Sequence, residues 1–380
     1  MTRGKPDFLL LLIVFLLVGF GLVMVFSASY YIALTNTESG DSYYYFKRQL
    51  LAAGLGLFVL FIAMNFKFTT YRKLVAPLLL ICVILLIAVF FTPEIKGAKR
   101  WILLPGGFQF QPSELAKIVA ILYAAHIFSK KHDRLDSFWR GLFPPLVVIG
   151  TLFVLIVLEP HFSSAFMLFA SSMVVVFCSR ARIRHLLILA AASVPVLIGF
   201  LMLRGYRLTR LETFFDPFAD RLDDGFQTVQ SLYAIAPGGW SGVGLGNSMQ
   251  KMLYLPEAHT DFIFSIIAEE LGFIGSSFLI FLYFLFVFRG IVIAWRAPNQ
   301  FGFLFAIGLV SLLGIQAFLN IAVATALIPV TGVPLPFVSY GGTSLLMNMA
   351  ISGILLNISR YRLPHKQHKK TTTSRSMANH

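Results

Sequence analysis

The chain has 380 residues, of which 57% are hydrophobic and 13% are charged, and its mean hydropathy is +0.79. This composition excludes an ordinary soluble domain and predicts an integral membrane protein. The net charge of +14 indicates membrane topology and attraction to anionic lipid headgroups. The sequence does not favour a nucleic-acid partner, because none of its basic patches is interleaved with exposed aromatic residues.

Apolar runs near the length of a membrane-spanning helix, roughly 20 residues, recur along the whole chain. The first run is long enough to favour an uncleaved anchor over a signal peptide, although Ser27-Ala28-Ser29 faintly resembles a cleavage site. The fifth and sixth runs are short and could be one broken element, but two spans keep the count even. We predict an all-α polytopic membrane protein of about ten transmembrane helices, near residues 8–28, 49–66, 74–92, 112–128, 142–158, 163–179, 186–203, 262–288, 301–325 and 342–359.

Positive charge predicts the orientation of this bundle. With the N-terminus inside, the inner segments hold 20 Lys and Arg residues and the outer loops hold 10. This bias predicts that both termini are cytoplasmic. Residues 1–359 then form a single integral-membrane domain, followed by a basic tail at 360–380 that we expect to be disordered. The longest outer loop, about residues 204–261, lies between spans seven and eight, and long loops on a rigid scaffold often carry function.

Three titratable residues stand where this outer loop enters the eighth apolar run. They are Glu257, His259 and Asp261. Ionisable residues at a membrane boundary usually mark a substrate or ion path. The alternative is that Asp261 or Thr260 only caps the helix that follows. A cap needs a single oxygen, however, and leaves Glu257 and His259 unexplained, so we predict an active site at the outer face.

Other charged residues are candidates for binding a phosphate group. Glu114 and Lys117 are three residues apart and therefore share one face of the fourth span. The alternative for this pair is a self-satisfied ion pair that supports packing. Arg48 stands at the outer mouth of the second span, where it could instead extend to lipid headgroups. Lys99 and Arg100, on a neighbouring outer loop, could serve the same purpose.

Two segments are rich in glycine or proline. The glycines of 238–246 predict a backbone that turns sharply and approaches a ligand closely. The prolines of 333–342 prevent a continuous helix and predict a loop or re-entrant turn before the last span. Ser339 in this loop could donate a hydrogen bond to substrate, although stabilisation of the loop itself is the favoured interpretation.

The absence of nucleotide-binding motifs from the sequence restricts the class of substrate that the chain could use. The chain has no G-x-x-x-x-G-K-[ST] loop and no cytoplasmic segment large enough to bind a nucleotide. An enzyme at the outer face would therefore need a donor with its own leaving group, such as a polyprenyl-pyrophosphate sugar. Cys82 and Cys178 fall in predicted spans and the His residues are scattered, so we expect neither a disulfide nor a protein-held metal. A Mg²⁺ or Mn²⁺ ion that bridges the substrate pyrophosphate remains an alternative, because an ion held mainly by the substrate leaves no sequence motif.

Five motifs together resemble the SEDS family of cell-wall polymerases, which includes FtsW, RodA and SpoVE. They are GAKRWI at 97–102, FQPSELAK at 110–117, GGWSGVGLGNS at 238–248, LPEAHTDF at 255–262 and GVPLPFVSYGG at 332–342. The resemblance covers about residues 8–360. The form PEAHTD at 256–261 is closer to the division and sporulation branches than to RodA.

The resemblance implies a peptidoglycan glycosyltransferase of the bacterial cell membrane that polymerises lipid II into glycan strands at the outer face and releases undecaprenyl pyrophosphate. It implies that Asp261 is the general base for the acceptor sugar's 4-hydroxyl, and it puts Glu114 and Lys117 in a central cavity. It also implies a class B penicillin-binding protein as transpeptidase partner, alongside other divisome or sporulation membrane proteins. The chain itself has no S-x-x-K cross-linking motif.

The chain departs from the family pattern at two places. The residues EPHFSS at 159–164 stand where members show Pro-Asp-Phe/Leu-Gly-Thr, so His161 replaces an acid and Glu159 could compensate. Ala322 and Ala326 stand where glycines are common, which predicts slightly looser helix contacts.

Two alternative functions fit parts of this pattern. A lipid II flippase would also use a charged ten-span bundle, but transporters tend to show internal repeats, and we find none here. A scaffold that only recruits the transpeptidase would leave the charges at 114–117 and 257–261 without a role.

Overall fold

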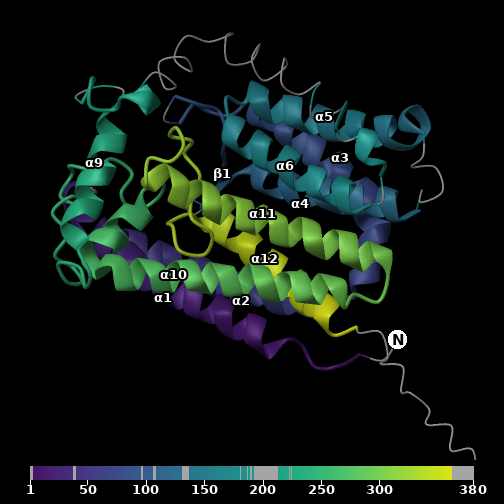
Figure 1. Cartoon of the computed structure of the whole chain (residues 1–380), viewed down its shortest axis with the longest axis horizontal. Coiled ribbons are helices and arrows are strands. Elements are labelled where there is room, and N and C mark those ends of the chain that lie inside the picture. The colour runs from purple at the N-terminus through teal and green to yellow at the C-terminus, as the bar shows by residue number, and fades with distance from the viewer. Residues whose placement is uncertain are drawn as a thin grey trace, which may run out of the picture.

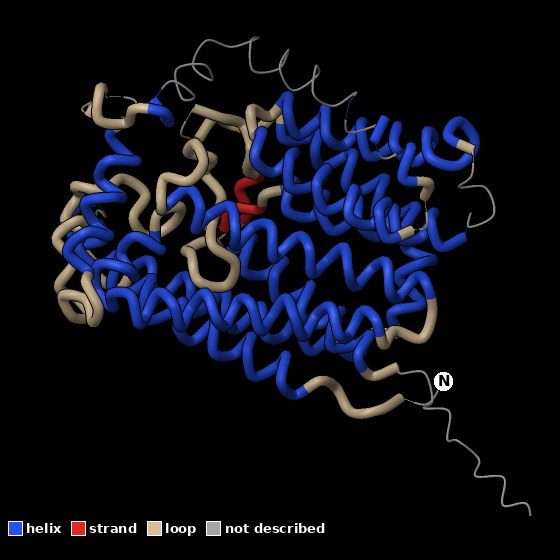
Figure 2. The backbone as a smooth tube through the Cα atoms, in the orientation of Figure 1, coloured by secondary structure: helices blue, strands red, loops and turns tan. Residues whose placement is uncertain are grey.

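The computed structural model describes residues 3–36, 40–95, 97–105, 108–130, 137–179, 181–185, 187–188, 191, 213–221, 223 and 225–361. These residues form a bundle of long helices that run mainly along the longest dimension of the molecule (Figure 1). The predicted all-α fold is confirmed, with one small addition. Two short antiparallel strands, β1 (Ile102–Leu104) and β2 (Phe108–Phe110), pair between two helices of the bundle (Figure 2).

Nine of the ten predicted spans correspond to helices in the described part of the chain. The seventh, at 186–203, lies almost entirely outside the described residues. The fifth and sixth are two separate helices, as predicted, and residues 159–161 join them. The helices that match predicted spans are α1 (Phe8–Asn36), α2 (Tyr44–Asn65), α3 (Tyr71–Val89), α4 (Pro112–Lys130), α5 (Phe143–Leu158), α6 (Phe162–Cys178), α10 (Ile263–Trp295), α11 (Gln300–Ala324) and α12 (Gly342–Ser359).

Shorter elements connect or flank these helices. Helix α9 (Phe226–Ile235) and the 3₁₀ turn η4 (Ala236–Gly238) precede α10. The 3₁₀ turn η1 (Phe68–Thr70) leads into α3, and the π turn η3 (Phe138–Leu142) leads into α5.

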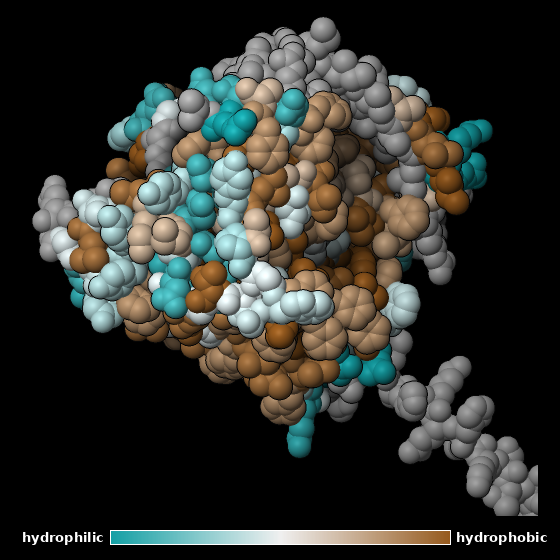
Figure 3. All heavy atoms as spheres, turned by 60° about the vertical axis from the view of Figure 1, so that its left-hand side comes forward, coloured by the Kyte–Doolittle hydropathy of each residue, from teal (hydrophilic) through white to brown (hydrophobic). Residues whose placement is uncertain are grey.

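The flanks of the bundle are apolar. Seven of the described helices are long and apolar enough to cross a membrane, and α6 is a shorter apolar helix. Large hydrophobic side chains such as Phe58, Leu80 and Phe284 are exposed on the helix surfaces. Figure 3 shows hydrophobic residues along the flanks and more hydrophilic ones gathered at the loop-rich end that carries α9. Such a surface requires lipid around it, and the chain is a multi-pass membrane protein.

Helices α11 and α12 hold the bundle together. Helix α11 packs against α10 on one side and against α4 and α6 on another. Helix α12 packs mainly on α2 and is largely buried. In Figure 1, α11 accordingly lies between the group α3–α6 and the group formed by α1, α2 and α10.

Both described ends of the chain lie at one end of the bundle. The Gly4 amide donates to the Arg360 carbonyl over 2.8 Å. The Arg289 guanidinium, near the end of α10, pairs with Asp7 at 2.7 Å between Nη2 and Oδ2. The side of the membrane that this end faces remains a prediction from the charge pattern. The glycine-rich loop and the start of α10 lie at the opposite end, beside α9 (Figure 1).

Candidate active site

Helix α10 is broken near the loop that leads to Asp261. Gly272 has φ 64° and ψ −159°, so the helical hydrogen-bond pattern stops there. The amides of Val243 and Gly244 donate to the freed carbonyls of Glu269 and Glu270, over 2.9 and 3.1 Å. Beyond the break, the amides of Phe273 and Ile274 donate to the carbonyls of residues 239 and 240, over 2.9 and 3.1 Å. The loop thus satisfies buried backbone groups that the break would otherwise leave without partners.

The glycines of this loop allow two backbones to touch. A Cβ atom on Gly242 would lie 2.1 Å from the Glu270 carbonyl oxygen, and one on Gly238 would lie 2.1 Å from the Ala268 oxygen. No side chain fits at these distances. The prediction that the glycine-rich segment approaches a ligand is therefore corrected, because at these two positions it approaches α10.

Two adjacent acids of α10 fasten the same loop through their side chains. Glu269 accepts hydrogen bonds from the Ser248 hydroxyl and from the Met249 amide. Glu270 accepts from Lys251 and from Ser27 of α1, each over 2.7 Å. Sequence reasoning missed these acids. The available signal was two consecutive carboxylates inside an apolar helix, which are costly in a membrane protein unless they are paired.

The loop delivers Asp261 to the start of α10. The N-cap position of that helix is Phe262, one residue after Asp261, and no side-chain hydrogen bond is made at this position. The Asp261 carbonyl accepts from the Asn320 side chain of α11 over 2.7 Å. The half-buried carboxylate faces Gly332, where an added Cβ would lie 3.5 Å from Oδ2. Asp261 is thus positioned by two neighbouring elements.

Residues around Asp261 are tied to one another. The Glu257 carboxylate accepts from the Thr260 hydroxyl over 2.8 Å, and Glu257 has a positive φ of 53°. The buried Ser339 hydroxyl donates to the Thr260 carbonyl over 2.5 Å and accepts from the Leu335 amide over 2.8 Å. The Ser339 hydroxyl therefore stabilises the loop, which is the interpretation that the sequence favoured over substrate contact.

His259 and Arg48 meet at two tyrosines. The buried His259 ring lies 4.7 Å from the Tyr45 ring and 5.6 Å from the Tyr340 ring. Burial raises the pKa of the Tyr340 phenol, and the Arg48 guanidinium, which is hydrogen-bonded to it, opposes that rise. Arg48 also lies 4.6 Å from the Tyr44 ring centroid. The structure thus brings Arg48 to the residues beside Asp261, in contrast to the alternative in which it extends to lipid headgroups.

The end of α11 carries the two alanines that depart from the family. Ala326 has a positive φ of 56°, the amide of Leu327 donates to the carbonyl of Ala322, and the amide of Ala326 donates to the carbonyl of Val323. This is the helix ending in which glycine is favoured. Ala326 therefore holds a strained backbone conformation at this helix ending, and the expectation of slightly looser helix contacts stays a prediction.

A second polar cluster lies within the bundle. Lys117 and Glu114 of α4 are both buried, with 2.7 Å between Nζ and Oε1. His161, also buried, contacts the Ser113 hydroxyl at 3.3 Å through Nδ1 and the Ser164 hydroxyl at 3.1 Å through Nε2. Burial holds the pKa of His161 well below its usual value, and the charges of Arg100 and Lys117 lower it further. His161 is therefore a neutral imidazole within this cluster.

Arg100 and Glu159 complete this cluster. Arg100 donates to the carbonyls of Glu159 and Pro160. The Glu159 side chain is fully buried, and neither carboxylate oxygen has a hydrogen-bond partner among the described residues. Burial raises its pKa to about 8, although Arg100 opposes the rise. Lys99 lies apart from this cluster, because its exposed side chain donates to the Phe90 carbonyl at the end of α3.

The two clusters meet at one loop. The Ser163 hydroxyl donates to the Thr331 carbonyl, and the next residue, Gly332, is the one that the Asp261 carboxylate faces. A path of neighbouring residues thus joins the Lys117 cluster to Asp261.

The assembled geometry agrees with comparisons to known proteins. Residues 7–363 match the family described as cell cycle protein, FtsW/RodA/SpoVE. The chain belongs to this family.

Curated members of the FtsW/RodA/SpoVE family match nearly the whole chain. Stage V sporulation protein E of Bacillus subtilis is 41% identical over 94% of this chain and 98% of its own length. The probable peptidoglycan glycosyltransferase FtsW of Geobacter sulfurreducens is 41% identical over 93% of this chain and 95% of its own length. The probable peptidoglycan glycosyltransferase FtsW of Bacillus subtilis is 39% identical over 96% of this chain and 93% of its own length. The predicted similarity to FtsW and SpoVE is confirmed.

Solved structures of the family share the fold. One solved structure is a peptidoglycan synthase complex that coordinates polymerization and crosslinking. A chain of that complex matches this one with a TM-score of 0.76 at 30% identity. The match covers 93% of this chain and 98% of the chain in the complex. The rod shape determining protein RodA of Thermus thermophilus has a TM-score of 0.68 at 29% identity, and the match covers 94% of this chain and 98% of RodA.

Proposed function

We propose that this chain is a peptidoglycan glycosyltransferase that polymerises lipid II into glycan strands in cell division or sporulation. The names of its FtsW and SpoVE relatives support both the activity and the setting. The observation that carries the proposal is the Asp261 carboxylate, half-buried at the start of α10 and joined through one loop to a second cluster that contains the buried Lys117 and the half-buried Arg100.

Asp261 is proposed as the general base. Its carboxylate takes the proton of the acceptor sugar's 4-hydroxyl while that oxygen bonds to the anomeric carbon of the donor. The bond from this carbon to the pyrophosphate oxygen breaks, and undecaprenyl pyrophosphate leaves with the electron pair.

The leaving pyrophosphate needs positive charge near it. Lys117, Arg100 and Arg48 are the proposed sources. Lys117 has three N–H donors, and in the described structure Glu114 accepts from one of them. The pair can therefore support packing and still leave donors of Lys117 for phosphate, and the substrate contact of Lys117 is part of this proposal. We propose the neutral ring of His161 as a hydrogen-bonding group beside them.

A divalent cation is proposed only as a companion of the substrate. No group of three His, Cys, Asp or Glu side chains that could hold a metal occurs in the described part of the chain. Mg²⁺ usually keeps several waters and binds through one or two carboxylates together with substrate phosphates. Lipid II would therefore bring most of the ligands for such an ion, with Glu257 as the nearest additional carboxylate in the Asp261 loop.

We propose that the active site faces outward and works beside a transpeptidase. The excess of Lys and Arg in the opposite segments supports this orientation. The structural neighbour in a peptidoglycan synthase complex that coordinates polymerization and crosslinking supports a penicillin-binding partner. We propose a class B penicillin-binding protein in this role, together with other divisome or sporulation membrane proteins.

Labelled lipid II tests the activity directly. Purified full-length protein in detergent is expected to produce glycan strands, and Asp261→Asn is expected to produce none while keeping the wild-type unfolding temperature. Asp220→Asn, an exposed acid on the outer segment, is the matched control and should polymerise normally. If the wild type produced no glycan but moved lipid II across vesicle membranes, the flippase would replace this proposal.

A further inference from the structure

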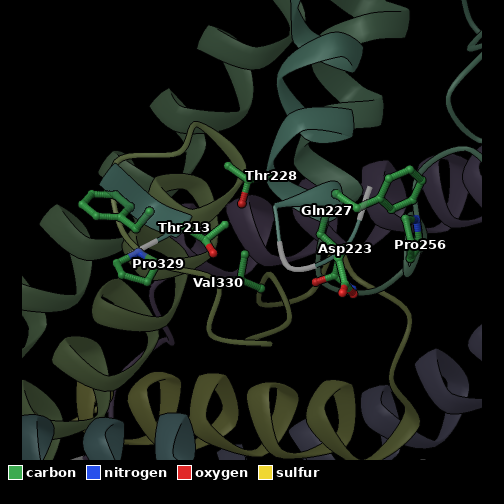
Figure 4. A pocket seen from close by; sticks show the side chains of 9 residues that line it. Thr213, Asp223, Gln227, Thr228, Pro256, Pro329 and Val330 are labelled. Atoms are coloured by element: carbon green, nitrogen blue, oxygen red, sulfur yellow. The ribbon is translucent and has the colours of Figure 1, made fainter. Parts of the chain in front are cut away.

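A cavity of about 290 Å³ lies at the α9 end of the bundle, and the proposed mechanism does not use it. Its walls come from three segments that are distant in sequence. They are residues 213–214, 223 and 226–228, then Pro256 of the Asp261 loop, and the pair Pro329–Val330 that follows α11. Figure 4 shows Asp223 between Val330 and Pro256, with Gln227 beside it.

The lining combines flat apolar groups with short polar ones. Phe214, Phe226 and the prolines supply the apolar surfaces, and Asp223, Gln227 and Thr228 supply a carboxylate, an amide and a hydroxyl. Apolar walls with a few placed polar groups are typical of small-molecule sites. A sugar ring matches this lining, because its C–H face packs on aromatic or proline surfaces and its hydroxyls bond to the polar groups.

The size and charge of the cavity restrict the class of ligand that it could bind. Its volume is near the lower limit of ligand pockets, roughly 300–1,000 Å³, which suits one substituted ring rather than a lipid tail. Among the described residues, its lining contains one carboxylate and neither lysine nor arginine. Asp223 would repel a pyrophosphate, and no described lining residue is a cation that would attract it. The proposed phosphate-binding residues Lys117 and Arg100 lie in the separate cluster, so the described lining favours a neutral ligand.

The position of the cavity connects it to Asp261. Pro256 is bonded to Glu257 of the Asp261 loop, and Val330 precedes by two residues the Gly332 that the Asp261 carboxylate faces. We propose that this cavity binds the N-acetylated sugar ring of the acceptor and presents its hydroxyl to Asp261. The proposal rests on the proposed function, because it assigns the acceptor side of the same reaction.

A single-coupling assay separates the acceptor from the donor. The donor is lipid II with its 4-hydroxyl blocked, and the acceptor is lipid II in which a methylene group replaces the anomeric oxygen, so that its C1–CH2–P linkage cannot break and the acceptor cannot act as a donor. Their product is one tetrasaccharide, whose initial rate gives a KM for each partner. Asp223→Asn, Gln227→Ala and Phe226→Ala are each expected to raise the acceptor KM about five- to tenfold. The donor KM and kcat are expected to stay within about twofold.

The matched control is Asp220→Asn, an exposed acid of the same segment that does not line the cavity. It should leave both KM values unchanged. An unchanged acceptor KM in the cavity variants, or an equal rise of both KM values, would overturn the assignment. Asp223→Asn and Gln227→Ala alter side chains at the cavity surface, so they test the assignment even if Phe226→Ala fails to fold. If the wild type couples no tetrasaccharide at all, the proposed function fails instead, and the two failures are distinguishable.

Discussion

Lys251 and Glu270 form an ion pair inside the bundle, with 2.7 Å between Nζ and Oε1 and with 5% and 0% of their side chains exposed. The Ser27 hydroxyl of α1 hydrogen-bonds both partners. This contact fastens the loop that ends at Asp261 to α10 and to α1 together. It makes the position of the proposed general base depend on a pair whose members lie ten residues before Asp261 and nine residues after it.

Lys251→Met should destabilise the fold strongly, because it leaves the Glu270 charge buried without its cation. Removing one partner of a buried pair typically costs about 3–5 kcal/mol of unfolding free energy. The double variant Lys251→Met with Glu270→Leu should recover most of this loss, and denaturant unfolding in detergent measures both. Lys47→Met removes an exposed ion pair with Asp41 and should change stability little. Equal losses in the single and double variants would contradict the prediction.

Ala326→Gly should stabilise the protein. Ala326 adopts a φ of 56° at the end of α11, a conformation that costs a non-glycine residue about 1–2 kcal/mol. Glycine removes this strain, and thermal unfolding should therefore shift upward. Ala322→Gly, inside the same helix, is the matched control and should destabilise by about 1 kcal/mol. A lower unfolding temperature in both variants would show that backbone strain at position 326 is not significant.

Lys117→Met should reduce polymerisation by about 100-fold or more, the typical effect of losing an electrostatic stabiliser of the transition state. Because this variant leaves Glu114 buried and unpaired, the informative comparison is Lys117→Met with Glu114→Gln, which removes both charges. The double variant should fold at the wild-type unfolding temperature and remain inactive with labelled lipid II. Recovery of activity in it would leave the pair with a packing role alone.

Glu159→Gln should remove a pH dependence of stability. The native pKa of Glu159 is raised to about 8 by burial, above its ordinary value of 4.5. Between these values the native state keeps a proton that the unfolded state has lost, so the free energy of unfolding falls as pH rises. The slope should approach about 1 kcal/mol per pH unit at most. Unfolding midpoints at pH 5, 6, 7 and 8 should decline in the wild type and decline less in Glu159→Gln, and identical declines would refute the assignment.

The sequence by itself determined the membrane class, most of the spans and the family. Spans can be predicted because the length and hydrophobicity of a run are local properties, and nine predicted runs match helices in the described part of the chain. The pairing of Glu114 with Lys117 was also predictable, since residues three apart share a helix face. Asp261 stood out because an acid at a membrane boundary needs a chemical reason.

Only the tertiary structure decided which distant residues meet. The contacts of Ser163 with Thr331 and of Ser339 with Thr260 join segments 168 and 79 residues apart, and no local pattern encodes such a contact. The glycines of 238–246 signalled a close backbone approach, but a missing Cβ has the same sequence signature whether the neighbour is a ligand or another helix. The folded chain resolves this ambiguity because the break at Gly272 exposes the backbone groups that the loop then satisfies.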